Sequence, residues 1–163
     1  MLELRNIKKV FDGISVLNDV NISFQRGKKL GLSGGNGTGK STLLNIATGF
    51  LSFEEGLISL NGKDVTHFEA WKLSRLGIKR TFQKVRFNEA IIIKEQLYSN
   101  DNIISKNMSM LEEAGIVDYF YSFPNEVPLP ILRKVEVARA LLDSPEYIFL
   151  DEPSAGMAAN DLH

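Results

Sequence analysis

The sequence predicts an α/β fold, and three observations carry that prediction. Segments typical of strands and of helices alternate along the 163 residues, as in proteins whose sheet and helices share one core. A glycine-rich loop lies between a short apolar segment at 28–33 and a helical segment that begins at Lys40. The apolar run from Tyr147 to Leu150 leads directly into Asp151 and Glu152, which places two carboxylates at the end of an expected buried strand.

Each further element is expected from a local pattern. Leu2 and Leu4 indicate a first strand, and Val20, Ile22 and Phe24 alternate with polar residues as in a half-buried second strand. The next elements are, in order, a strand at 28–33, a helix from Lys40 stopped by Gly49, a hairpin at 57–65 turning at Asn61-Gly62, a helix at 68–76 and a strand at 77–82. Residues 84–131 are expected to be helical and irregular, followed by a helix at 132–142 and a strand at 147–150.

Composition excludes several classes of protein. Nineteen Lys and Arg against twenty Asp and Glu give a net charge of −1, so no overall cationic field favours nucleic acid or an anionic membrane. The chain has no Cys, which excludes disulfides, thiolate metal sites and Cys nucleophiles. The first residues contain no apolar run suited to a signal peptide, and the longest apolar runs are only about four residues. We therefore expect a single-domain cytoplasmic protein.

Residues 34–41 match the pattern G-x-x-x-x-G-K-[ST] in full, between an expected strand and an expected helix. Backbone N–H groups and a helix N-terminus can surround a triphosphate only where glycines let the backbone approach it. Lys40 would then reach the β- and γ-phosphates, and Ser41 would bind Mg²⁺. The alternative is a chance match, expected in about one of a few hundred such chains. The residues assigned to the nucleotide are Gly34, Gly35, Asn36, Gly37, Thr38, Gly39, Lys40, Ser41 and Thr42.

Hydrolysis also needs a carboxylate near Mg²⁺ and a group that orients water. Asp151 would hold Mg²⁺ through water, and Glu152 would polarise the attacking water. The alternative is that two acids simply open the next loop, but the apolar strand before them disfavours this reading. A Ras-like GTPase is excluded, because the chain lacks both D-x-x-G soon after the loop and N-K-x-D for guanine.

Four segments occur in the order used by ATP-binding cassette ATPases, namely 34–42, Thr81-Phe82-Gln83, 135–141 and 147–153. More narrowly, GIKRTFQKVRF and DEPSAGM resemble the ATPase subunits of branched-chain amino-acid importers. The resemblance spans the whole chain. It implies a RecA-like P-loop NTPase core with an antiparallel β subdomain and an inserted helical subdomain, and it implies ATP and Mg²⁺ as ligands.

The resemblance also implies roles for single residues and a division of the chain. Phe11 matches the aromatic residue that stacks on adenine, and Gln83 matches a residue that contacts Mg²⁺ and water. The alternatives are a core aromatic and a solvated loop glutamine, and Glu54 and Glu55 are interpreted as a solvated turn. Residues 1–163 would be one incomplete cassette domain. Within it, 1–83 and 132–163 would form the nucleotide-binding core, and 84–131 a helical subdomain facing membrane subunits.

The sequence departs from the family after residue 127. The family binds ATP between two subunits, with an L-S-G-G-Q signature of one subunit at the γ-phosphate of the other. The matching stretch here is 127–131, where Pro130 replaces a glycine and removes a backbone donor. The D-loop, 155–158, has alanine where many relatives have aspartate, and the chain ends at His163, before the position of the family's switch histidine.

These departures leave two hypotheses about function. In the first, the chain is the ATP-hydrolysing subunit of an importer of branched-chain or similar amino acids. It would then pair with a second cassette, as a homo- or heterodimer, and with transmembrane permease subunits at the inner face of the cell membrane. In the second, it is a shortened, degenerate cassette that binds ATP, or merely folds, without driving transport. A DNA-repair or translation cassette is disfavoured, because those usually carry long insertions or tandem cassettes.

Overall fold

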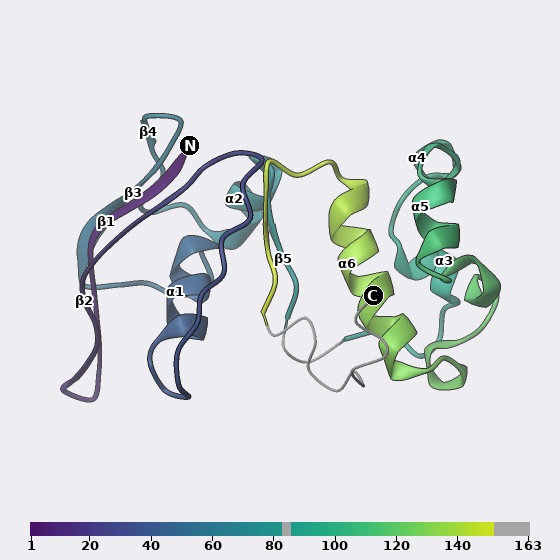
Figure 1. The fold of residues 1–163 in the computed structure, drawn as a ribbon, viewed down its shortest axis with the longest axis horizontal. Coiled ribbons are helices and arrows are strands. Elements are labelled where there is room, and N and C mark those ends of the chain that lie inside the picture. The colour runs from purple at the N-terminus through teal and green to yellow at the C-terminus, as the bar shows by residue number, and fades with distance from the viewer. Residues whose placement is uncertain (83–85, 152–163) are drawn as a thin grey trace. The chain divides into compact units, whose positions relative to one another are not determined.

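The computed structural model describes residues 1–82 and 86–151. The chain divides into two compact units, Met1–Lys79 and Arg80–His163, and Figure 1 shows the elements of each. The alternation of strands and helices that the sequence predicts is confirmed. None of the helices in the described part of the chain has the length and apolar character needed to cross a bilayer.

The first unit contains an antiparallel sheet with strand order β2–β1–β3–β4 (Figure 1). Its strands are β1 (Leu2–Phe11), β2 (Ile14–Phe24), β3 (Glu55–Leu60) and β4 (Lys63–Asp64). The N-terminal strands and the hairpin are therefore confirmed. The hairpin turns at Asn61 and Gly62, with φ angles of 52° and 78°, because two-residue turns with positive φ match the twist of the paired strands.

Helix α1 (Lys40–Ala47) directly follows the glycine-rich loop, as predicted. It ends before Gly49, whose φ of 75° is the left-handed conformation that stops helices. Its buried residues are Leu43, Leu44, Ile46 and Ala47. Helix α2 (Ala70–Arg75) is shorter than the 68–76 expected.

The strand predicted at 28–33 is not formed, so this prediction is wrong. These residues have no regular secondary structure, and Leu30 and Leu32 are 54% and 37% exposed. A strand is stable only where a neighbour accepts and donates its backbone hydrogen bonds. Within the described residues of the first unit, the sheet runs from β2 to β4 and pairs no strand with this segment. The apolar residues of segment 28–33 indicate that it could be buried, but they carry no information on whether another strand lies close enough to pair with it.

The second unit is mainly helical. It contains α3 (Ile93–Gln96), α4 (Asp101–Lys106), α5 (Met108–Glu113), two 3₁₀ turns at Val117–Tyr119 and Pro124–Glu126, α6 (Leu129–Leu142) and β6 (Tyr147–Phe149). Strand β5 (Ile78–Arg80) pairs with β6, and the N–H of Thr81 donates to the carbonyl of Phe149 at 2.9 Å.

Helix α6 and the short helices share one apolar core. Its buried members are Ile93, Leu97, Ile104, Leu111, Ile116, Phe120, Val127, Val135, Ala138 and Leu142. The helix begins at Leu129, three residues earlier than the predicted 132. Pro130 explains the difference, because a proline in the first turn loses only an N–H that would have no intrahelical partner.

Candidate functional site

The glycine-rich loop turns back on itself around the side chain of Lys40. The Lys40 Nζ donates to the carbonyl oxygens of Gly34 and Gly35, at 2.8 and 2.7 Å. The Thr38 Oγ1 closes the loop by donating to the Gly35 carbonyl at 2.9 Å. The ammonium group is therefore held against the loop, next to the N-terminus of α1, where the helix dipole also favours an anion.

Gly39 joins this loop to the sheet. Its φ of 88° is left-handed, and it precedes the first residue of α1. A Cβ at this position would lie 2.8 Å from Leu17 Cδ2 and 3.2 Å from the Val16 carbonyl oxygen. Strand β2 and the start of α1 can therefore approach this closely only because residue 39 has no side chain.

Phe11 stands at the end of β1, 41% exposed, rather than in the core. The Lys9 Nζ lies 5.0 Å from the centre of its ring, within the range of a cation–π contact. The same ammonium donates to Glu54 Oε1 at 2.8 Å, and Glu54 Oε2 accepts the Val10 N–H at 2.9 Å. Glu54 lies at an exposed bend just before β3, as expected for a solvated turn, and its carboxylate also contacts β1.

The Lys9–Glu54 contact predicts a pH dependence of stability. The Lys9 hydrogen bond, followed by that of the Val10 N–H, lowers the pKa of Glu54 below its usual 4.5. The carboxylate therefore stabilises the fold above that value, and the contribution is lost as the pH falls through the lower folded-state pKa. We expect Glu54→Gln to be less stable than wild type at neutral pH, with the difference shrinking in acid. Denaturant midpoints measured from neutral pH downward test this, and a pH-independent difference would contradict it.

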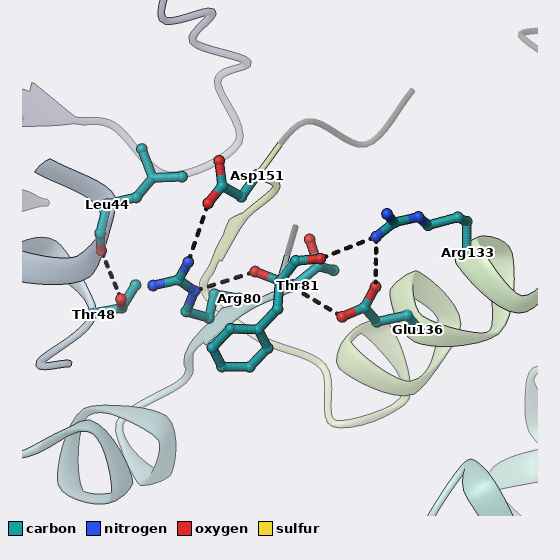
Figure 2. A network of polar contacts seen from close by, with 8 residues as sticks. Leu44, Thr48, Arg80, Thr81, Arg133, Glu136 and Asp151 are labelled. Atoms are coloured by element: carbon teal, nitrogen blue, oxygen red, sulfur yellow. Dashed lines mark hydrogen bonds and ion pairs between the residues drawn. The ribbon is translucent and has the colours of Figure 1, made fainter. Parts of the chain in front are cut away.

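In the second unit, Asp151 is paired with Arg80 (Figure 2). The Arg80 Nη2 lies 3.4 Å from Asp151 Oδ2, and the two side chains are only 6% and 12% exposed. The Arg80 Nε also donates to the Thr81 carbonyl at 3.1 Å. Burial lowers the pKa of the guanidinium, whereas the carboxylates of Asp151 and Glu136 oppose that shift. Arg80 remains charged at neutral pH and holds the carboxylate predicted to bind Mg²⁺.

Two side chains of α6 hold the backbone of Phe82, the residue before Gln83. The Phe82 N–H donates to Glu136 Oε1 at 2.9 Å, and Arg133 Nη1 donates to the Phe82 carbonyl at 3.1 Å. Arg133 and Glu136 also form an ion pair at 3.6 Å, three residues apart on the helix, and Figure 2 shows both side chains reaching from α6. Two side chains one turn apart on α6 thus fix both the N–H and the carbonyl of Phe82.

The first turn of α6 offers few backbone donors. Pro128 is the N-cap, and Pro130 follows within the turn, so neither position has an N–H. The N–H groups of Ile131 and Leu132 both bond the Pro128 carbonyl, at 3.0 and 3.1 Å. Among positions 128 to 131, the two prolines therefore have no backbone N–H, and the N–H of Ile131 is already used within the helix.

The predicted site residues are distributed over the two units. Phe11 and the loop residues from Gly34 to Thr42 lie in the first unit, where Gly39 connects the loop to β2. Asp151 lies in the second unit. Gln83 and Glu152 lie outside the described residues, so their roles stay predictions.

Sequence reasoning missed Lys9, Glu54 and Arg80. Lys9 carried a signal, because it alternates with Ile7 and Phe11 as on one strand face, and in the structure it is only 7% exposed. A lysine among apolar residues of one strand face requires a buried or nearby anion. Glu54 and Arg80 had no such signal, since their partners lie 45 and 71 residues away in the sequence.

The residues present fit a nucleoside triphosphate with Mg²⁺. The loop residues from Gly34 to Thr38 are exposed, and α1 has no acidic residue in its first turn to repel an anion. The Lys40 ammonium is held by the carbonyl dipoles of Gly34 and Gly35, which a phosphate could replace. The hydroxyl of Ser41 and the carboxylate of Asp151 are oxygen donors of the kind that Mg²⁺ prefers.

Comparison with known proteins agrees with these features. The family described as ABC transporter matches residues 17–155. A probable branched-chain amino acid transport ATP-binding protein, LivG of Archaeoglobus fulgidus, is 32% identical over 96% of this chain and 69% of its own length. The high-affinity branched-chain amino acid transport protein BraF of Pseudomonas aeruginosa is 28% identical over 96% of this chain and 71% of its own.

Solved structures show the same fold. An ATP-binding cassette of an ABC transporter matches all of this chain and 73% of its own length, with 31% identity and a TM-score of 0.88. A nucleotide-free cassette matches 99% of this chain with 30% identity and a TM-score of 0.86. The chain therefore belongs to the ABC transporter family, as an ATP-binding cassette with a RecA-like P-loop fold.

Proposed function

We propose that this chain is the ATP-hydrolysing subunit of a transporter that imports branched-chain or similar amino acids. The observation that carries the proposal is the loop of residues 34–41, with the Lys40 ammonium held over it and α1 starting at its end. Two relatives named as branched-chain amino acid transport proteins support the substrate class. A related cassette was solved in its ADP conformation, which supports an adenine nucleotide.

Each site residue has a distinct task in this proposal. Phe11 stacks on the adenine, and Lys40 with the loop N–H groups neutralises the β- and γ-phosphates. Ser41, Gln83 and Asp151 hold Mg²⁺, which supplies charge neutralisation at the phosphates. Glu152 polarises the attacking water.

The chain needs partners to complete this task. Residues 1–83 and 132–163 form the nucleotide-binding core in this proposal, and 84–131 form a helical subdomain that faces permease subunits at the inner face of the membrane. A second cassette supplies the signature that closes the nucleotide site. Because the first turn of α6 has few donors, this chain contributes little to its partner's site. Pairing with a different, signature-bearing cassette is therefore favoured over self-pairing.

A second candidate function, ATP binding without transport, also rests on the N-terminus of α6. A cassette with Pro128 and Pro130 at the start of α6 could bind ATP without driving transport, because a pairing of two such chains supplies few backbone donors for the γ-phosphate. Binding without turnover in every pairing would distinguish this function from the first.

The deciding experiment measures ATP hydrolysis by the chain alone and after addition of a cassette with an intact signature. We expect slow turnover alone and a gain of roughly tenfold or more with the partner, since missing transition-state donors cost at least that much. The control partner carries alanine in place of its signature serine and should give a much smaller gain. Equal rates with and without the intact partner would refute the transport ATPase and favour the second candidate.

A further inference from the structure

The end of β1 is held by Glu54 from the neighbouring segment of the sheet. One carboxylate oxygen accepts from Lys9 Nζ at 2.8 Å, and the other accepts from the Val10 N–H at 2.9 Å. The Glu54 N–H itself donates to the Lys8 carbonyl at 3.0 Å. Glu54 therefore contacts three consecutive residues of β1, which are the residues that lead directly to Phe11.

Lys9 connects this anchor to the aromatic ring. Its side chain is 9% exposed, and its ammonium is 5.0 Å from the centre of the Phe11 ring. Phe11 itself is 41% exposed. A ring with a cation near it and substantial exposed surface can still offer a face to a flat partner.

The β1–β2 hairpin connects the ring to the phosphate loop. Phe11 pairs with Ile14 across a two-residue turn at Asp12 and Gly13, whose φ angles are 48° and 81°. A few residues further along β2, Val16 and Leu17 form the close approach to Gly39. The ring is thus part of the same short hairpin that contacts the start of α1.

We propose that Lys9 and Glu54 are positioning residues that hold the Phe11 ring for stacking on the purine base of the nucleotide. The proposal rests on the function proposed above. Lys9 fixes the ring and withdraws electron density from it, which favours stacking with an electron-rich purine. Glu54 keeps the lysine in place, because a buried ammonium without an anion would otherwise turn toward water.

Affinities for ATP and for inorganic tripolyphosphate test the proposal by calorimetry on the full chain. Lys9→Met and Glu54→Ala are each expected to weaken ATP binding by about fivefold and to leave tripolyphosphate binding unchanged. Lys9→Arg retains a cation and should bind ATP as wild type does. Phe11→Ala sets the largest loss that removal of stacking can produce.

A matched control lies one residue away on the same strand. Lys8 forms an ion pair with Glu55 at 2.9 Å, but both side chains are well exposed, at 39% and 68%. Lys8→Met therefore removes the same charge from β1 and should change neither affinity. Thermal unfolding of each variant verifies folding, and Glu54→Gln replaces Glu54→Ala if the latter does not fold.

The outcomes separate this proposal from the function on which it rests. If Phe11→Ala weakens ATP binding but Lys9→Met does not, the positioning role is refuted and stacking stands. If Lys9→Met weakens ATP and tripolyphosphate equally, the lysine acts on the phosphates or the fold, which also refutes the proposal. If Phe11→Ala has no effect on either ligand, stacking itself fails. Absence of ATP binding by the wild-type chain would refute the proposed function.

Discussion

Replacing Lys40 by alanine should weaken ATP binding by roughly a hundredfold, the largest effect expected of any single substitution at the nucleotide site. The Lys40 ammonium lies against the loop carbonyls, next to the N-terminus of α1, where phosphates are expected. A hydrogen bond to a charged group contributes about 1.5–3 kcal/mol, and Lys40 is expected to donate to both terminal phosphates. Calorimetric titration with Mg-ATP measures the change.

Two further variants show whether the loss belongs to this ammonium. Lys29→Ala removes a positive charge from the exposed segment before the loop and should leave the affinity nearly unchanged. Lys40→Arg keeps the charge but replaces a compact ammonium by a larger planar fork, so it should not restore binding. Unchanged affinity in Lys40→Ala would contradict the assignment of the loop to the nucleotide.

Replacing Arg80 by methionine should lower the free energy of unfolding by about 3 kcal/mol. The substitution leaves the Asp151 carboxylate, only 12% exposed, without the guanidinium that pairs with it. It also removes the Arg80 hydrogen bond to the Thr81 carbonyl and a cation–π contact 4.7 Å from the centre of the Phe82 ring. Urea or guanidinium denaturation of the full chain gives the difference.

The double variant isolates the charge pair from these other losses. With Asp151→Asn added to Arg80→Met, no uncompensated carboxylate remains, and we expect recovery of about 1 kcal/mol or more. Arg86→Met, at an exposed position, should change stability by less than about 0.5 kcal/mol. Strict additivity of the two substitutions at Arg80 and Asp151 would show that the pair contributes nothing to stability.

The features predicted correctly from the sequence depend on residues close together in the chain. The glycine-rich loop and α1 are encoded in a short contiguous stretch that starts at Gly34. The turn at Asn61 and Gly62 is encoded in these two residues alone, because both adopt the positive φ angles that the turn requires. Strand β1 follows from the local alternation of Leu2 and Leu4 with polar residues, and strand β6 follows from a local run of apolar residues. Such patterns express backbone conformation and burial, which neighbouring residues largely determine.

Features that depend on distant partners required the folded chain. The apolar segment 28–33 carried a strand signal, but it forms no strand because pairing is a property of two segments. Strand register places Glu54 against Lys9, and the end of β5 places Arg80 beside Asp151. The sequence contains all of these charges, but a carboxylate binds whichever donor the fold brings within about 3 Å. The residues of the phosphate loop are therefore evident from the sequence, whereas the side chains that hold Phe11 and Asp151 in place are set by the packing of the fold.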